Sequence, residues 1–463
     1  MTKLKVVQAF DRAVFAETDT DDAASLESKL ARAAALFADR SRALRPYRRA
    51  EVLRQAAVLV GARREELARR IAQEGGKPLA DARVEVTRAI DGLRDAADEL
   101  RSFAGAEVPM GLTPASDGRW AFTTKEPIGV VAAISAFNHP LNLIVHQVAP
   151  AIAVGCPVIV KPATATPLSC VAFVELLRAA GLPEDHCQVL VTEDNALAER
   201  LATDPRIAFL SFIGSAKVGW YLRSKLAPGA RCALEHGGAA PVVVDRSAKL
   251  DAIVEPLVKG AYYHAGQVCV SVQRVFAHAA IADDLAARLE ARIGALRTGD
   301  PLRPDTEVGP LILPREVDRV EAWIAEARSG GARVTGGRRA SETTLEPAVI
   351  VEPPADAKVS ALEVFGPVVC VYRYTDLDDA IARANALPWA FQASVFASDI
   401  EPALRVARRI DASTVLVNDH TAFRTDWMPF AGRRQSGYGT GGIPYSMRDM
   451  THEKMIVLRH DDP

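Results

Sequence analysis

From Ile128 onward, strand-like runs alternate with helical ones, and this alternation constrains the fold more than any other feature of the sequence. The β-rich runs in the first half are Val130–Ser135, Pro157–Val160, Gln188–Val191, Ile207–Phe212 and Pro241–Val244. Helical stretches such as Leu168–Ala180 separate them. The alternation predicts an α/β fold with parallel βαβ units, because parallel neighbours need a crossover connection. Parallel sheets bind ligands beyond the carboxyl ends of their strands, so we expect site residues just after these runs.

The remaining patterns extend this organisation to both ends of the chain. A second alternating region spans about 250–417 and contains β-rich runs at Val272–Ala277, Val368–Tyr372, Gln392–Phe396 and Thr414–Asn418. Residues 22–104 carry three apolar stripes at helical spacing, with Gly75–Pro78 separating the second from the third. A last β-rich segment covers Met455–Leu458. With 463 residues the chain is long enough for about three domains.

Composition excludes several classes of protein. Hydrophobic residues make up 49% and charged residues 25%, as in ordinary globular proteins. The net charge of −2 gives no reason to expect nucleic acid or an acidic membrane surface as a partner. The longest apolar stretches, such as Gly129–Phe137, are much shorter than the roughly 20 residues of a membrane span. The first residues lack the apolar core of a signal peptide, so we expect a cytoplasmic protein with reduced cysteines.

Cys269 is a candidate nucleophile. It lies between Gly266 and Ser271, small residues that suit a tight turn presenting a side chain. A thiolate is the most nucleophilic side chain near neutral pH. A lone cysteine is more often a small buried apolar residue, so this segment alone does not establish a reactive thiol.

Glu235 and Asn138 are candidates for proton transfer and oxyanion binding. Glu235 stands beside the pair Gly237-Gly238 and just before an apolar run, an unusual place for a solvated carboxylate. There it suits a general base, although most such carboxylates are solvated or paired. Asn138 follows the first strand, where its amide suits an oxyanion but is equally typical of a turn.

Further polar residues follow the later strands. Lys161 ends one run, where it suits contacts with ribose or phosphate or is simply a solvated charge. Gly214 and Ser215 precede a helix whose N-terminus favours an anion, although a cap without ligand is the commoner case. Glu363 is a carboxylate among apolar residues.

One formal motif is interpreted as a loop. The segment Gly437–Gly442 matches G-x-G-x-x-G, but Arg433–Ser436 precedes it instead of a strand, and Pro444 interrupts the segment after it. The nine histidines are scattered without metal-ligand spacing, so no metal site is predicted.

Seven short motifs together resemble the aldehyde dehydrogenase superfamily over nearly the whole chain. They are Phe137–Leu141, Val160–Ala163, Phe212–Ser215 with Gly219, Leu234–Gly238, Gly266–Cys269, Glu363–Pro367 and Pro429–Gly432. Each is weak alone, but their order and spacing together are very specific.

The resemblance implies a covalent hydride-transfer mechanism. Cys269 would attack an aldehyde, Asn138 and the Cys269 backbone N–H would hold the oxyanion, and Glu235 would activate the water that hydrolyses the thioester. The cofactor would be NAD or NADP. The residues that the resemblance assigns to it are Ser135, Phe137, Lys161, Ala163, Thr164, Gly214, Ser215, Val218, Glu363 and Phe365.

The resemblance also implies an architecture. A Rossmann-like cofactor domain would comprise residues 1–107 and 126–236, and a catalytic α/β domain residues 237–447. Residues 108–125 and 448–463 would form a small β oligomerisation flap, whose terminal strand offers an edge for pairing in a homodimer or homotetramer.

Thr164 departs from the family pattern. Many NAD-preferring members have a glutamate at this position, which binds the adenosine ribose. Without the carboxylate there is no repulsion of a 2′-phosphate, and threonine can donate a hydrogen bond to one. We therefore expect NADP to be accepted, alongside NAD.

Three residues are expected to face the aldehyde: His139, His146 and Arg424. Their pattern is similar to the branch that oxidises phosphonoacetaldehyde, sulfolactaldehyde, lactaldehyde and glyceraldehyde 3-phosphate. Arginine grips carboxylate, sulfonate and phosphonate well, so we expect a short aldehyde with an anionic tail. The alternatives are a salt bridge between Arg424 and Asp426 or another acidic residue, and histidines that only pack.

Two other functions remain as alternatives. In a CoA-acylating aldehyde dehydrogenase CoA takes the acyl group, but such members often lack the glutamate found here as Glu235. A non-enzymatic structural relative would not need Cys269, Glu235 and Asn138 together.

Overall fold

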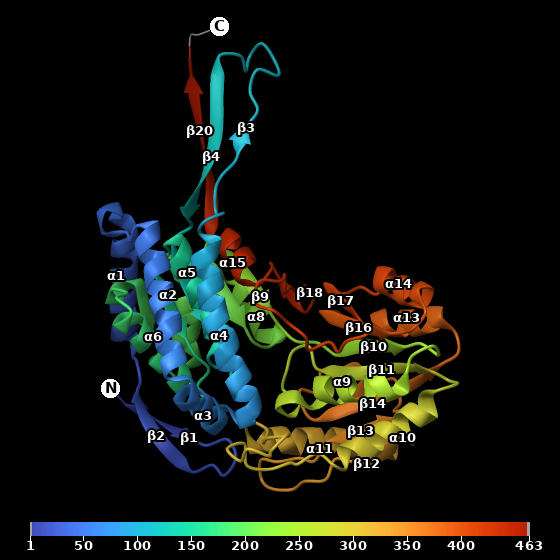
Figure 1. Ribbon diagram of the computed structural model, residues 1–463. Coiled ribbons are helices and arrows are strands. Elements are labelled where there is room, and N and C mark those ends of the chain that lie inside the picture. The colour runs from blue at the N-terminus through green and yellow to red at the C-terminus, as the bar shows by residue number, and fades with distance from the viewer. Residues whose placement is uncertain (1, 461–463) are drawn as a thin grey trace.

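The structure is a computed structural model that describes residues 2–460, and over these residues the strands form five sheets. Two large lobes lie side by side, and an arm of β-strands projects from the first lobe (Figure 1). Met1 and residues 461–463, which belong to the expected cofactor domain and flap, lie outside the described residues.

The first lobe contains a six-stranded sheet in the order β19-β9-β8-β5-β6-β7. All of its pairings are parallel except that of β19 with β9. The strands are β5 (Val130–Ile134), β6 (Val158–Lys161), β7 (Cys187–Val189), β8 (Ile207–Ile213), β9 (Arg231–Glu235) and β19 (Gly437–Tyr438).

Helices cover both faces of this sheet, because its strands are apolar on both sides. Val131 and Ala133 of β5 pack into one core and Val130 and Ala132 into the other, as the two-residue period of a strand requires. The first core is completed by α2 (Pro46–Ala62), α3 (Arg64–Gly75), α4 (Leu79–Glu99), α5 (Asn142–Val154), α6 (Leu168–Ala179) and α15 (Ile443–Asp449). The second is completed by α1 (Ala23–Ala38), α7 (Asn195–Thr203) and α8 (Ala216–Ser224).

The second lobe is built on a seven-stranded sheet in the order β12-β13-β14-β11-β10-β16-β17, antiparallel only at β12. Its strands are β10 (Ala240–Val244), β11 (Val272–His278), β12 (Arg333–Gly336), β13 (Ala348–Val351), β14 (Val368–Tyr374), β16 (Gln392–Phe396) and β17 (Thr414–Val417). Its helices are α9 (Leu250–Tyr262), α10 (Ala282–Ile293), α11 (Pro314–Ser329), α12 (Lys358–Ala361), α13 (Leu377–Asn385) and α14 (Ile400–Arg409).

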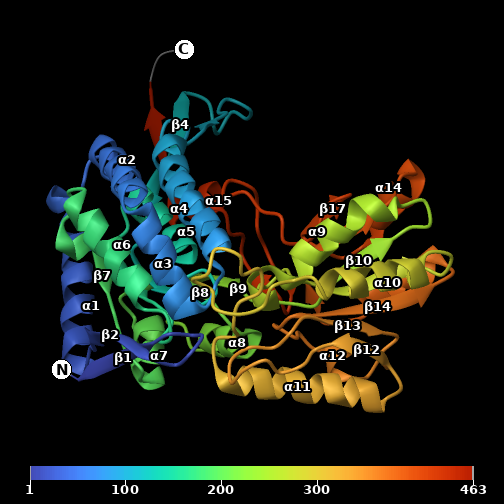
Figure 2. The same ribbon diagram turned by 60° about the horizontal axis from the view of Figure 1, so that its bottom comes forward.

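The arm is a three-stranded antiparallel sheet in the order β20-β4-β3. It comprises β3 (Glu107–Val108), β4 (Arg119–Pro127) and β20 (Thr451–Arg459), and β20 pairs with β4 over its whole length. Two small sheets complete the fold. One pairs β15 (Trp389–Ala390) with β18 (Arg433–Arg434), and the other is the hairpin of β1 (Lys3–Val7) and β2 (Val14–Asp19), which lies beside α3 (Figure 2).

Some features of the elements differ from expectation. The second helical stripe lies in α2, and a separate helix, α3, follows it after Arg63, so Gly75–Pro78 separates α3 from α4. The β1–β2 hairpin was not anticipated, because two short half-buried strands leave a weak pattern.

The segment interpreted as a loop at Gly437–Gly442 also differs in part from the structure. Its first two residues form β19, and Pro444 does not interrupt a helix but stands in the first turn of α15, where no N–H is needed. The division of the chain into three domains stays a prediction. No helix of residues 2–460 is long and apolar enough to cross a bilayer.

Candidate active site

A cavity of about 760 Å³ brings together the carboxyl ends of β5, β6, β8 and β9 and loops of the second lobe. Parallel strands end at one edge, which explains why residues far apart in sequence meet here. Of the residues singled out in the sequence, the cavity is lined by Ser135, Phe137, Asn138, His139, Ala163, Thr164, Gly214, Ser215, Val218, Glu235, Cys269, Glu363, Phe365 and Arg424. Lys161 and His146 are not among the lining residues.

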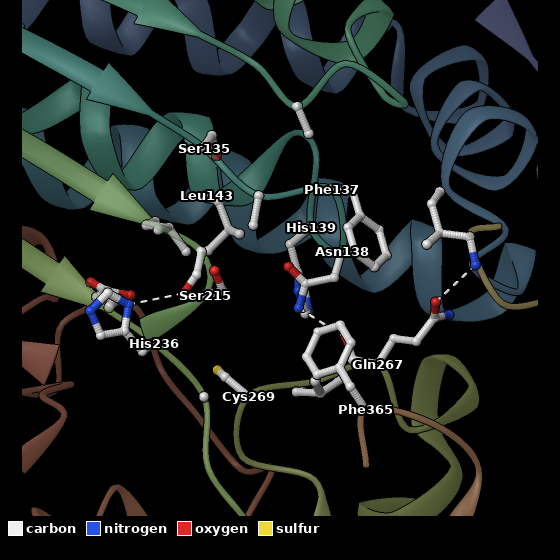
Figure 3. Close-up of a pocket in the computed structure, with 18 of the residues that line it drawn as sticks. Ser135, Phe137, Asn138, His139, Leu143, Ser215, His236, Gln267, Cys269 and Phe365 are labelled. Atoms are coloured by element: carbon white, nitrogen blue, oxygen red, sulfur yellow. Dashed lines mark hydrogen bonds between the residues drawn. The ribbon is translucent and has the colours of Figure 1, made fainter. Parts of the chain in front are cut away.

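Cys269 lies in a tightly folded loop with its sulfur directed toward the cavity (Figure 3). The loop follows the 3₁₀ turn Tyr263–Gly266. A Cβ at Gly266, whose φ is +70°, would stand 2.1 Å from the Gly366 carbonyl oxygen, so only glycine fits. Burial raises the pKa of the Cys269 thiol to about 12, against a smaller lowering by the nearby Arg424 charge. The resting side chain is therefore a neutral thiol that needs a base.

Asn138 is held in place by the same loop (Figure 3). Its Nδ2 donates to the Gln267 carbonyl oxygen at 2.9 Å. Gln267 is itself fixed, since its Oε1 accepts from the backbone N–H of Ile312 at 2.9 Å. The amide group of Asn138 is thus oriented with one N–H engaged and a second available for an oxyanion.

Glu235 is the last residue of β9, whereas the sequence had placed it only before a strand. Burial raises its pKa, and the charge of Arg424 opposes the shift. A Cβ at Gly441 would lie 2.1 Å from Glu235 Oε1, so this glycine leaves room for the carboxylate. A half-buried carboxylate with a raised pKa is suited to take a proton near neutral pH.

The other half of the cavity has features that fit a dinucleotide cofactor. Ser215 occupies the N-cap position of α8 but makes no side-chain capping bond, so the helix N-terminus keeps donors for an anion. Glu363 accepts a hydrogen bond from the Gly238 N–H at 3.0 Å, and burial raises the pKa of Glu363 to about 7. Phe365 meets Phe137 edge-on, with ring centroids 5.9 Å apart.

Two expected cofactor contacts are engaged within the protein. Lys161 is buried, and its Nζ donates to the Pro162 carbonyl oxygen at 3.1 Å. The Thr164 hydroxyl donates to the Thr192 carbonyl oxygen at 3.3 Å. The Lys161 ammonium keeps two further N–H donors for a ribose or a phosphate, whereas the Thr164 hydroxyl must exchange its acceptor before it can donate to either.

His236, next to the candidate base, braces the loop before α8. Its Nδ1 bonds to the Gly214 carbonyl oxygen at 2.9 Å (Figure 3). A Cβ at Gly219 would stand 2.0 Å from the His236 ring, so the helix admits the imidazole only because of this glycine. His236 thus fills space beneath the helix N-terminus, and no interaction with Glu235 contributes to the shift in the Glu235 pKa.

One arginine of the site, Arg88, was not identified from the sequence; Asp426 lies between it and Arg424. Arg88 of α4 lines the cavity and is paired with Asp426, with Nη2 2.7 Å from Oδ1. Asp426 also bonds to His146. The expected alternative, an Arg424–Asp426 salt bridge, is not formed within residues 2–460, because Arg88 and His146 occupy the carboxylate. Only a folded structure reveals Arg88, which on sequence is one charge among many on a helix.

The family model for the aldehyde dehydrogenase family matches residues 1–456. The chain belongs to this family. A 3-sulfolactaldehyde dehydrogenase of Priestia megaterium is 38% identical over 413 residues, which are 89% of this chain and 86% of the relative.

Two solved structures are also similar to this chain. Aldehyde dehydrogenase 21 of Physcomitrella patens in complex with succinate superposes with a TM-score of 0.96 at 33% identity, covering 99% of this chain and 95% of the other. Glyceraldehyde-3-phosphate dehydrogenase of Methanocaldococcus jannaschii complexed with NADP gives 0.94 at 30% identity, covering 98% and 99%. The expected fold and the family branch are confirmed, and the protein is an oxidoreductase that acts on aldehydes with NAD or NADP.

Proposed function

We propose that the protein oxidises a short aldehyde with an anionic tail to the carboxylic acid, through a covalent intermediate on Cys269. The observation that carries the proposal is the Arg424 guanidinium, which lines the same cavity as Cys269 and pairs with no carboxylate of residues 2–460. A half-buried cation that forms no ion pair favours an anionic ligand.

Proton movements are assigned to the chain's own residues. Glu235 takes the proton of the Cys269 thiol, whose sulfur attacks the aldehyde carbon. The second N–H of the Asn138 amide and the Cys269 backbone N–H donate to the developing oxyanion. Glu235 releases this proton to solvent and then takes a proton from the water that attacks the thioester carbonyl. The acid leaves as the C–S bond breaks, and Glu235 passes the water's proton to the Cys269 sulfur.

The cofactor half is assigned to the residues around α8 and Glu363. The backbone N–H groups at the start of α8, beginning with Ser215, suit the pyrophosphate, and Glu363 suits ribose hydroxyls. When bound, the nicotinamide supplies a hydride acceptor. Thr164 brings no carboxylate to the cavity, so we propose that NADP is accepted alongside NAD.

The relatives support an anionic substrate. Sulfolactaldehyde, succinate and glyceraldehyde 3-phosphate, named for three of the proteins above, each carry an anionic group. The three proteins are similar in length to this chain. The three small molecules share an anionic group at the end of a short chain.

A paired aldehyde assay tests the proposal. Succinic semialdehyde and butanal have the same carbon number, and only the first carries a carboxylate. We expect wild type to prefer the anionic aldehyde, and Arg424→Ala to raise its KM by about tenfold or more, as for loss of a charge-assisted hydrogen bond. Cys269→Ala should abolish cofactor reduction with both. An unchanged KM for succinic semialdehyde in Arg424→Ala would remove the anchor from the proposal.

The same assay with added CoA distinguishes the CoA-acylating alternative. We expect free acid as the product, because Glu235 is present and half-buried beside the thioester site. Formation of an acyl-CoA would instead show that the acyl group of the thioester is transferred to CoA.

Assembly through the arm is a further part of the proposal. β20 is an edge strand, and the arm exposes Trp120, Met455 and Leu458 at 70%, 53% and 49%. Exposed apolar side chains beside a free strand edge favour pairing with a second copy in a homodimer or homotetramer. Light scattering of wild type and of Met455→Lys tests this, with a smaller particle expected for the variant. The cytoplasmic location stays a prediction.

A further inference from the structure

We propose that Asp426 and His146 act as positioning residues that hold the Arg424 guanidinium as an anion anchor. The inference deepens the proposed function and rests on its assignment of Arg424. Selectivity for an anionic aldehyde would then depend on two side chains outside the cavity wall, since neither His146 nor Asp426 lines it.

The hydrogen bonds determine the state of His146. Its Nε2 lies 2.6 Å from Asp426 Oδ1, and its Nδ1 lies 3.2 Å from Arg424 Nη2. An arginine N–H only donates, so Nδ1 must accept and cannot carry hydrogen. The hydrogen of a neutral imidazole is then on Nε2, where it donates to the carboxylate. One neutral tautomer satisfies both contacts, and no other state does.

The surroundings favour this neutral state. His146 is 4% exposed in the middle of α5. Burial lowers its pKa to about 4, more than the neighbouring Asp426 raises it. A protonated imidazole would also present a hydrogen to the Arg424 cation, which is repulsive. His146 therefore transmits the orientation of Asp426 to Arg424 without adding charge.

Arg88 keeps the carboxylate from neutralising the anchor. Its Nη2 donates to Asp426 Oδ1 at 2.7 Å and its Nε to Oδ2 at 3.3 Å, while Asn142 Nδ2 donates to Oδ1 at 3.2 Å. Arg88 and Asp426 cancel in charge and His146 is neutral, so this cluster does not neutralise Arg424, and Glu235 is the carboxylate of the cavity whose charge acts on it. The cluster thus holds the Arg424 cation in a fixed position at the cavity.

The Arg424 guanidinium is held in two ways: its flat face lies over an aromatic ring, and one edge forms a hydrogen bond. Arg424 Cζ lies 3.5 Å from the centroid of the Phe430 ring, and Nη2 is tied to His146. Arg424 Nε is buried without a hydrogen-bond partner among the described residues. A planar group fixed by stacking and by one edge bond presents its remaining N–H groups in one direction, which lowers the cost of ordering it when an anion binds.

The test compares the selectivity ratio, kcat/KM for succinic semialdehyde divided by kcat/KM for butanal, with the cofactor saturating. We expect His146→Phe to lower this ratio about tenfold, as for loss of a hydrogen bond to a charged group. In the Arg424→Ala background His146→Phe should change the ratio less than about twofold, because the anchor it positions is gone. His146→Gln, which can donate to Asp426 and accept from Arg424, should recover part of the loss.

A matched control and a direct measurement complete the design. His186→Phe changes a half-buried histidine outside the cavity lining and should leave the ratio unchanged. Nitrogen NMR of histidine-labelled wild type, assigned by the signal lost in His146→Gln, should show His146 neutral with hydrogen on Nε2 at pH 7. This second readout does not depend on the folding of His146→Phe.

The outcomes separate the inference from the function beneath it. An unchanged ratio in Arg424→Ala refutes the anion anchor itself. A lowered ratio in Arg424→Ala with an unchanged ratio in His146→Phe overturns only the positioning role. Equal losses for both aldehydes in His146→Phe, or a protonated or Nδ1–H imidazole in wild type, overturn it as well.

Discussion

A buried ion pair beneath the Asn138 loop offers a stringent test of how the first lobe holds the site. Lys77 Nζ pairs with Glu85 Oε2, and both side chains are fully buried. Glu85 Oε1 accepts the backbone N–H groups of Leu141 at 2.9 Å and Asn142 at 3.1 Å. One carboxylate therefore both compensates a buried charge and satisfies the start of α5, directly after Asn138.

The structure sets the size of the effect. Glu85→Ala leaves the Lys77 charge unpaired, which costs about 3–5 kcal/mol, and leaves two buried N–H groups without acceptors, at about 1–3 kcal/mol each. The lower ends of these ranges give about 5 kcal/mol as a lower bound. With roughly 2–4 °C per kcal/mol for a folding unit of this size, the melting temperature should fall by at least about 10 °C. Lys77→Met/Glu85→Gln removes the charge and keeps one acceptor oxygen, so it should lose far less.

Thermal unfolding followed by circular dichroism and by residual activity measures the shift. The control is Glu65→Ala, which breaks the exposed Arg83–Glu65 pair and should cost less than about 1 kcal/mol. The reasoning is refuted if Glu85→Ala melts no lower than Glu65→Ala, or if the double variant melts below Glu85→Ala.

Three further predictions concern the site itself. Glu235→Gln should slow steady-state turnover by about 10²–10⁴-fold, and it should also slow the first burst of reduced cofactor, because Glu235 takes the Cys269 proton before the sulfur attacks. It should abolish the acidic limb of the rate profile. In wild type we expect the midpoint of this acidic limb at a pH above the usual range of carboxylate pKa values. The base must be ionised to act, and burial raises the pKa of Glu235. Gly237→Ala places a Cβ 1.7 Å from Glu363 Oε1, so the cofactor KM should rise about tenfold, whereas Gly299→Ala, with no atom within 4 Å, should not change it. Thr164→Glu should lower kcat/KM for NADP relative to NAD by about tenfold or more, as like charges meet, and an unchanged ratio would place the 2′-phosphate elsewhere.

The sequence alone predicted those parts of the fold and of the site that are determined by local patterns. The alternating runs predicted the parallel strands, and Asn138, Thr164 and Gly214 were expected at the cavity because the carboxyl ends of such strands share an edge. Cys269 and Glu235 gained their assignment from motif order, and the structure places both on the cavity wall.

What the sequence did not reveal depends on contacts between distant segments. Arg88 and Asp426 are 338 positions apart, and no periodicity links them. Gly441 was assigned to a loop because its function, leaving room for Glu235, exists only when two strands meet. His146 was expected at the substrate, and it lies instead behind Arg424, because α5 turns it toward Asp426.

The Arg88–Asp426 contact has a consequence for the order in which the protein is made. During synthesis α4 and α5 emerge long before residue 426, so Arg88 and His146 first meet without the carboxylate that compensates them. Burying that cation alone is unfavourable, so the helix pair should stay loosely packed on the ribosome until almost the whole chain has been translated. The side of the cavity that contains Arg88 should therefore reach its final packing only after residue 426 has been translated.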